Sequence, residues 1–228
     1  MPDAPHYGLD IETDTTIDGL DPATSPVVAV AVSTVHGDTV LTGAEADILE
    51  RLDDLLASLP TGVIVTWNGS SFDLPFLVHR ARVLGVTLGL ELCDRDARVV
   101  DPPWPPPPGG WRATWGAHGH LDGFRLYRAD VRRIVGLSCG LKAMARLVGL
   151  PVVEVDRSVI HELTADDLES YVSSDARLAR QLVARRMPGA AASVDRGPVP
   201  VALDALSSEA ADGPRPTTAL PDRSEVGG

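Results

Sequence analysis

Short apolar runs alternate with polar turns at the start of the chain, and their spacing predicts strands before it predicts helices. Residues 6–13 (HYGLDIET) have the short, half-apolar pattern of a strand. Residues 25–34 (SPVVAVAVST) and 37–43 (GDTVLTG) predict a β-hairpin that turns around residues 36–38. The chain is therefore expected to begin with three strands.

A helical pattern, a strand and a second helical pattern follow. Residues 44–58 place Ile48 and Leu52 at helical spacing, together with further leucines of the same stretch. Residues 62–67 (GVIVTW) predict a short buried strand rich in β-branched side chains, and residues 72–85 predict the next helix. Strands that alternate with helices in this way favour an α/β sheet with at least one parallel strand pair.

The later part of the pattern is mostly helical. Residues 120–124 predict one more short strand, and residues 125–135 and 140–150 predict two helices separated by glycines. Residues 164–187 predict a long helix with Thr164 as its N-cap.

An unusual insertion interrupts this pattern at about residues 95–120. It contains six prolines within residues 102–108 and three of the four tryptophans, Trp104, Trp111 and Trp115. The favoured interpretation is a surface loop or extended hairpin stiffened by polyproline II conformation. Two alternatives remain open: a platform on which tryptophans stack single-stranded bases, and a docking segment for a protein partner.

The domain organisation follows from these patterns and from composition. The chain of 228 residues is long enough for one medium domain with a real core. We predict that residues 1–187 form this domain, with the insertion at about 95–120. Residues 188–228 are rich in Ala, Gly, Pro and Ser without a sustained apolar period, so we expect a disordered C-terminal tail.

Composition and charge narrow the classes of function. The formal net charge is −12, which argues against a protein that binds nucleic acid through a broad basic surface. A local site that holds divalent cations remains compatible with it, because such ions prefer carboxylate oxygens. No apolar run approaches the roughly 20 residues of a membrane span, and the first residues lack the features of a signal peptide. Cys93 and Cys139 fit no metal spacing and nothing in the sequence argues for a disulfide, so a reducing cytoplasm is the expected location.

Two acids in the first predicted strand are the first candidates for chemistry. Asp10 and Glu12 are two residues apart, so on a strand they point to the same face. Like charges held side by side repel each other unless a cation lies between them. A strand end where both acids face water is the plain alternative.

Two further acids stand at positions where α/β folds build sites. Asp73 begins the predicted helix after a strand, where it suits a site at the sheet edge or a simple helix N-cap. Tyr171 and Asp175 are four residues apart on the long helix and therefore share one face. A half-buried tyrosine beside a solvated acid is the alternative there.

In chain order, these blocks resemble the three motifs of the DEDD superfamily of 3′→5′ exonucleases, in its tyrosine-bearing branch. The blocks read D-x-E, then N-G-x-x-F-D-x-P, then Y-x-x-x-D. The second block, residues 68–77, is especially similar to the version in the exonuclease domains of family B DNA polymerases. The histidine-bearing branch carries its histidine five residues before the last acid, where this chain has Ser170. The resemblance spans residues 7 to about 185.

The resemblance implies a ribonuclease H-like fold, an α/β fold with a mixed five-stranded sheet whose second strand is antiparallel, flanked by helices. It also implies that four acids hold two divalent cations, Mg²⁺ or Mn²⁺. Asp10 would bridge both cations, Glu12 and Asp175 would complete the first site, and Asp73 would support the second. Tyr171 would orient the attacking water.

For the substrate, the resemblance implies contacts from Asn68 and Phe72 to the terminal nucleotide, although Asn68 could instead only shape the turn. The expected function is a stand-alone, metal-dependent 3′→5′ exonuclease that acts on single-stranded 3′ ends, with DNA favoured, and releases nucleoside monophosphates. An RNA-trimming exonuclease and a non-catalytic nucleic-acid-binding or scaffold module are the alternatives. A protein partner at the insertion or the tail remains possible, and no membrane association is expected.

Overall fold

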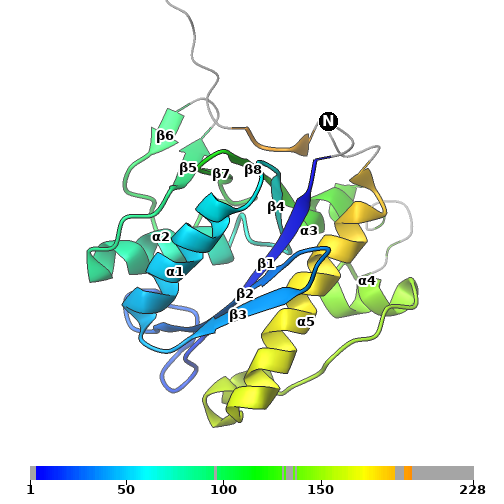
Figure 1. Cartoon of the computed structure of the whole chain (residues 1–228), viewed down its shortest axis with the longest axis horizontal. Coiled ribbons are helices and arrows are strands. Elements are labelled where there is room, and N and C mark those ends of the chain that lie inside the picture. Colours follow the sequence, from blue (N-terminus) through cyan, green and yellow to red (C-terminus); the bar gives the residue numbers. More distant parts are fainter. Residues whose placement is uncertain are drawn as a thin grey trace, which may run out of the picture. The chain divides into compact units, whose positions relative to one another are not determined.

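The strands form one sheet, which Figure 1 shows between helices on its two sides. The computed structural model describes residues 4–94, 97–129, 131, 136, 138–187 and 193–196. Within these residues the sheet has eight strands in the order β3-β2-β1-β4-β8-β7-β5-β6. The strands are β1 (His6–Thr13), β2 (Val27–Ser33), β3 (Asp38–Thr42), β4 (Val63–Thr66), β5 (Leu90–Asp94), β6 (Ala97–Val99), β7 (Arg112–Trp115) and β8 (His118–Asp122).

The first five strands of this order form the sheet that the sequence predicts. β2 is antiparallel to β1, as expected, and β3 is antiparallel to β2. β4 runs parallel to β1, and β8 runs parallel to β4. The fifth strand, which the pattern placed at residues 120–124, is therefore β8.

The expected number of five strands is wrong for the described chain. β5, β6 and β7 add three antiparallel strands beyond β8. The insertion is therefore part of the sheet and not a surface loop alone. Proline and glycine in its middle hid this, because they interrupt the alternation by which strands are recognised.

Helices cover both faces of the sheet. They are α1 (Glu45–Ser58), α2 (Asp73–Leu84), α3 (Gly123–Tyr127), α4 (Leu141–Leu147), η2 (Arg157–Glu162) and α5 (Ala165–Ala184). Ile48, Leu49, Leu52 and Leu56 of α1 pack with β1 and β2 side chains in the largest buried cluster. α5 packs on the opposite face of β1 and β2. Each predicted long helix is present, and Thr164 caps α5 by accepting from the Asp167 N–H.

Small residues let α5 lie unusually close to the sheet. A Cβ at Gly8 would come 2.0 Å from the Ala176 carbonyl oxygen, so only glycine fits there. Ala29 and Ala31 of β2 are fully buried beside Ala176 and Val172 of α5. Because Asp10 pairs with Ala31 and Glu12 with Ala29, this close approach brings α5 over both acids.

The predicted helix at residues 125–135 and the predicted tail lie partly outside the described residues. α3 (Gly123–Tyr127) covers the start of the former, whereas residues 130 and 132–135 are not described. Of the tail, residues 193–196 are described, and Asp195 forms a β-bridge with His120 of β8. No helix in the described ranges has the length and apolar character needed to span a bilayer.

Candidate active site

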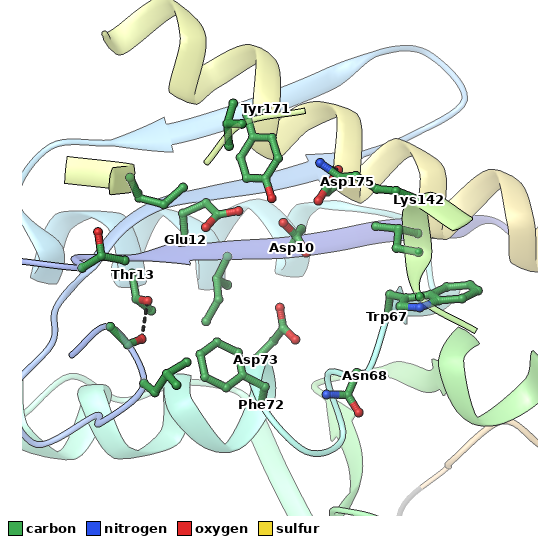
Figure 2. A pocket seen from close by; sticks show the side chains of 18 of the residues that line it. Asp10, Glu12, Thr13, Trp67, Asn68, Phe72, Asp73, Lys142, Tyr171 and Asp175 are labelled. Carbon is green, nitrogen blue, oxygen red and sulfur yellow. Dashed lines mark hydrogen bonds and ion pairs between the residues drawn. The ribbon is translucent and has the colours of Figure 1, made fainter. Parts of the chain in front are cut away.

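A single pocket of about 980 Å³ contains all the residues that the sequence singled out for chemistry. Its lining includes the four acids, the tyrosine and the two candidate substrate contacts. These are, in that order, Asp10, Glu12, Asp73 and Asp175, then Tyr171, then Asn68 and Phe72. Figure 2 shows Asp10 and Glu12 on β1, with Tyr171 and Asp175 of α5 on one side. On the other side lie Asp73, the first residue of α2, and Phe72 just before it. Residues separated by more than 160 positions in the sequence thus meet in one place.

The sheet register explains why the pocket lies here. β1 pairs with β4 only from His6 to Gly8, whereas β1 itself continues to Thr13. The half of β1 that carries Asp10 and Glu12 therefore extends beyond the end of β4. The loop that follows β4 turns into α2 at this level, and it brings Asp73 beside the projecting strand.

One wall of the pocket is α5. Tyr171 and Asp175 are buried, with exposed fractions of 0% and 2%, and they face β1 as their four-residue spacing predicts. Figure 2 shows the Tyr171 hydroxyl directed towards Asp10 and Glu12. The alternative of a half-buried tyrosine beside a solvated acid is therefore wrong for α5, and Glu12 is buried as well, with an exposed fraction of 6%.

Lys142 of α4 also reaches this wall, although no sequence motif predicted a role for it. Its Nζ lies 3.3 Å from an Asp175 carboxylate oxygen and 4.0 Å from the centre of the Tyr171 ring. It also donates to the Val153 carbonyl oxygen. One sequence feature could have drawn attention to it: Lys142 is the only lysine of the chain, and it stands at the start of a predicted helix.

The other wall is the loop between β4 and α2, and Asp122 holds it in place. The Asp122 carboxylate accepts from the backbone N–H of Asn68 at 3.0 Å and of Ser70 at 3.1 Å. It also caps α3 by accepting from the Phe124 and Arg125 N–H groups. Asp122 therefore positions the site loop and is itself outside the pocket lining.

Asn68 does shape the turn. It has a φ of +70°, a left-handed conformation that asparagine tolerates better than most residues. Its side chain is exposed at the rim of the pocket, so a contact to substrate stays a prediction. Phe72 occupies the position before α2 and presents a half-buried ring at the pocket.

The histidines near the insertion are structural. His118 is buried in β8, where it accepts from the Gly62 N–H and its other ring nitrogen lies 2.8 Å from the Leu56 carbonyl oxygen. His120 pairs with the Thr66 hydroxyl at 2.9 Å. Both lie in β8, which is flanked by β4 and β7 in the sheet.

The donor types fit divalent cations, because carboxylate oxygens are what Mg²⁺ and Mn²⁺ prefer. Glu12, Asp73 and Asp175 are buried within the same pocket, where charged groups require compensation. In the part of the chain that the structure describes, no three His, Cys, Asp or Glu side chains are grouped closely enough to hold a metal as they stand. Lys142 supplies a positive charge beside Asp175 in this arrangement.

Comparison with known proteins gives the family context of this site. Residues 8–97 match the family model for the exonuclease domain of family B DNA polymerases. A DNA polymerase of Pyrococcus glycovorans is 32% identical over 94 residues, which cover 36% of this chain and 12% of the relative. DNA polymerase 2 of Aeropyrum pernix is 33% identical over 86 residues, which cover 36% of this chain and 11% of the relative.

The fold comparison agrees over a longer stretch. The structure of the family B DNA polymerase from the hyperthermophilic archaeon Pyrobaculum calidifontis matches 81% of this chain and 24% of that chain, with a TM-score of 0.60 and 23% identity. Together these matches support a family-B-like exonuclease domain in this chain. The ribonuclease H-like fold expected from the sequence is thereby confirmed, with three strands more than expected.

The family-B-like domain matches only a small part of its relatives. The chain spans about an eighth of the polymerases that it matches in sequence, and about a quarter of the matching solved chain. The matched residues 8–97 include Asp10, Glu12 and Asp73 but end before Tyr171 and Asp175. The roles of the last two residues are therefore argued from their place in the pocket.

Proposed function

We propose that this domain is a metal-dependent 3′→5′ exonuclease that hydrolyses phosphodiester bonds at single-stranded 3′ ends and releases nucleoside monophosphates. DNA is the favoured substrate, because the relatives that match the domain are named as DNA polymerases. The observation that carries the proposal is the meeting of Asp10, Glu12, Asp73, Tyr171 and Asp175 in one pocket from three separate elements.

The acids divide between two cation positions in this proposal. Asp10 lies between the two walls and would contribute to both positions, Glu12 and Asp175 to one, and Asp73 to the other. The bound cations would supply Lewis-acid stabilisation of the charge that develops on the phosphate and on the leaving oxygen. To hold the cations the carboxylates would have to come closer together, and Asp175 would share its charge between Lys142 and a cation.

Tyr171 has a positioning task for the attacking water. An unperturbed tyrosine has a pKa near 10, so it is a poor base at neutral pH but a good hydrogen-bond partner. The packing of its buried ring fixes the hydroxyl towards the acids of β1. Asn68 and Phe72 at the opposite wall would contact the terminal nucleotide.

The charge of the chain is compatible with a polyanionic substrate only if the site itself is locally positive. The net charge of −12 repels nucleic acid at long range. Cations held in the pocket would reverse the sign where the 3′ end binds. Binding should therefore depend strongly on divalent ions.

The decisive experiment uses single strands of DNA and RNA labelled at either the 3′ or the 5′ end, with Mg²⁺, Mn²⁺ or EDTA. The variants are Asp10→Ala and Asp175→Ala, with Glu169→Ala as a matched control that removes an exposed acid from the same helix α5. We expect stepwise shortening from the 3′ end with either metal, a loss of roughly 10³-fold in both site variants, and no change in the control.

Each outcome has a clear meaning. Activity that survives EDTA or both substitutions contradicts the metal-dependent site. Preferential shortening of RNA identifies the RNA-trimming alternative. Binding of single strands without any cleavage identifies a non-catalytic module.

A further inference from the structure

Three tryptophans of the insertion contact the rest of the domain, and each contacts a different segment of the chain. Trp115 is buried in β7 and donates from Nε1 to Asp53 of α1 at 2.6 Å. Trp111 is buried, and its backbone N–H donates to the Ser70 carbonyl oxygen at 2.8 Å. Both rings are enclosed, so they offer no stacking platform, and that alternative is wrong for these two residues.

Trp104 is the third tryptophan, and it packs against α2 next to the active-site pocket. Its ring centre lies 6.1 Å from that of Phe72 and 5.7 Å from that of Phe76. It also contacts His79 edge-on at 5.8 Å. Phe72 and Phe76 are themselves in contact at 5.2 Å, so the four rings form one aromatic cluster behind the pocket.

The backbone of the insertion fits tightly against the same loop. Gly110 has a φ of +68°, and a Cβ there would come 2.2 Å from the Ser70 carbonyl oxygen. The site loop, residues 68–73, is thus held on one side by Asp122 and on the other by the insertion. Phe72 is the only member of the described aromatic cluster that also lines the pocket.

We propose that Trp104 is a positioning residue that braces Phe72 for contact with the terminal base of the substrate. This inference rests on the proposed function and adds to it that the insertion belongs to the substrate-binding apparatus. Phe76 is fully buried and supports the Phe72 ring from the first turn of α2, whereas Trp104 supports it from a separate segment of the chain. Without Trp104 the half-buried Phe72 ring gains rotational freedom, and the base loses a fixed surface on which to stack.

The test separates base recognition from phosphodiester chemistry. The variants are Trp104→Ala, Trp104→Phe, Phe72→Ala and the double variant, with Trp115→Phe as a control within the same insertion. Two substrates are compared: a short oligothymidylate, and bis(p-nitrophenyl) phosphate, which has no base. Binding of labelled oligothymidylate is also measured with Ca²⁺ in place of Mg²⁺.

We expect Trp104→Ala to raise the KM for the oligonucleotide and weaken its binding by about fivefold, within the range that one stacked base contributes. The kcat, and the rate with the base-free substrate, should stay near the wild-type values. Trp104→Phe should restore most of the affinity, and Trp115→Phe should leave it unchanged. In the Phe72→Ala background, the further change Trp104→Ala should have no effect.

Three results would contradict the positioning role of Trp104. The first is an unchanged KM for the oligonucleotide in Trp104→Ala, and the second is an equal loss of activity with the base-free substrate. The third is a loss of oligonucleotide affinity from Trp104→Ala that is just as large in the Phe72→Ala background. If Trp104→Ala fails to fold, as judged by circular dichroism, Trp104→Leu takes its place in the same measurements. A wild-type protein that binds the oligonucleotide but cleaves neither substrate contradicts the proposed function, and its binding constants still test the brace. A wild-type protein that does not bind at all contradicts both.

Discussion

The two walls of the pocket are built in different ways. The α5 wall depends on small residues, since Gly8 lets the helix touch the sheet and two residues four positions apart then face β1. The α2 wall depends on distant supports, since Asp122 anchors the loop and Trp104 packs behind Phe72. The first wall is a consequence of close packing, and the second is a consequence of contacts between segments far apart in the sequence.

This difference determines how each wall should fail. A helix pressed against a sheet cannot accommodate an extra atom without moving as a unit, because protein interiors are closely packed. A loop held by hydrogen bonds and ring contacts can lose one support and keep the others. Damage to the α5 wall should therefore affect stability and chemistry together, whereas damage to the α2 wall should affect mainly substrate binding.

Gly8→Ala is the most severe test of the α5 wall. The new Cβ would meet the Ala176 carbonyl oxygen at 2.0 Å, so α5 must move away from β1. We expect a loss of about 3 kcal/mol in the free energy of unfolding, measured by urea denaturation. A displacement of Tyr171 and Asp175 on the order of 1 Å should lower kcat by about 10²-fold.

The matched control is Gly140→Ala, where the nearest atom to a Cβ is the Ser138 hydroxyl at 3.6 Å. It should change the unfolding free energy by less than about 1 kcal/mol. Equal effects from the two substitutions would show that the close approach of α5 is not what holds this wall.

The two walls also differ in how far the sequence predicts them. Tyr171 and Asp175 could be placed on one face from their spacing, and Asp10 and Glu12 from strand alternation, because both rules act within a single element. The contacts of Asp122 and Trp104 could not, since each depends on where a distant segment lies. The same limit explains why the sequence predicted too few strands. The strands of the insertion form because they pair with neighbouring strands, and their own residue pattern does not predict them.

Asp122→Ala removes the anchor of the α2 wall. It leaves the N–H groups of Asn68 and Ser70 without their acceptor and removes the cap of α3. We expect a loss of about 3 kcal/mol in the free energy of unfolding and a higher KM, with kcat less affected than in Gly8→Ala. Asp122→Asn keeps one oxygen and should lose less than half as much. A fall in kcat with an unchanged KM would place Asp122 in the chemistry instead of in loop support.

Lys142→Met tests the charge balance of the α5 wall. It removes the cation beside the buried Asp175 and should cost about 2 kcal/mol of unfolding free energy in EDTA, as expected when one partner of a mostly buried pair is lost. In Mg²⁺ the cost should be smaller, because a bound cation can supply the missing charge. The control is Arg177→Met, which removes the more exposed ion pair between Arg177 of α5 and Asp38. It should cost less than about 1 kcal/mol of unfolding free energy in both conditions. A cost for Lys142→Met that does not depend on Mg²⁺ would argue that no cation binds beside Asp175.

The smallest expected effect is a pH dependence confined to the α2 wall. Burial, and then the nearby Arg82, hold the pKa of His79 below its ordinary value of 6.5. The unfolded chain therefore binds this proton more readily. The contribution of neutral His79 to the free energy of unfolding is fully present above pH 6.5 and declines as the pH falls below it.

Since His79 contacts Trp104, protonation of His79 should loosen the support of Phe72. The pKa of His6 is lowered as well, first by its partial burial and then by Arg180, so His79→Gln must be compared with the wild type at each pH. We expect the melting temperature to fall less steeply between about pH 7 and 5.5 in His79→Gln, and identical slopes would show that His79 does not couple the insertion to pH.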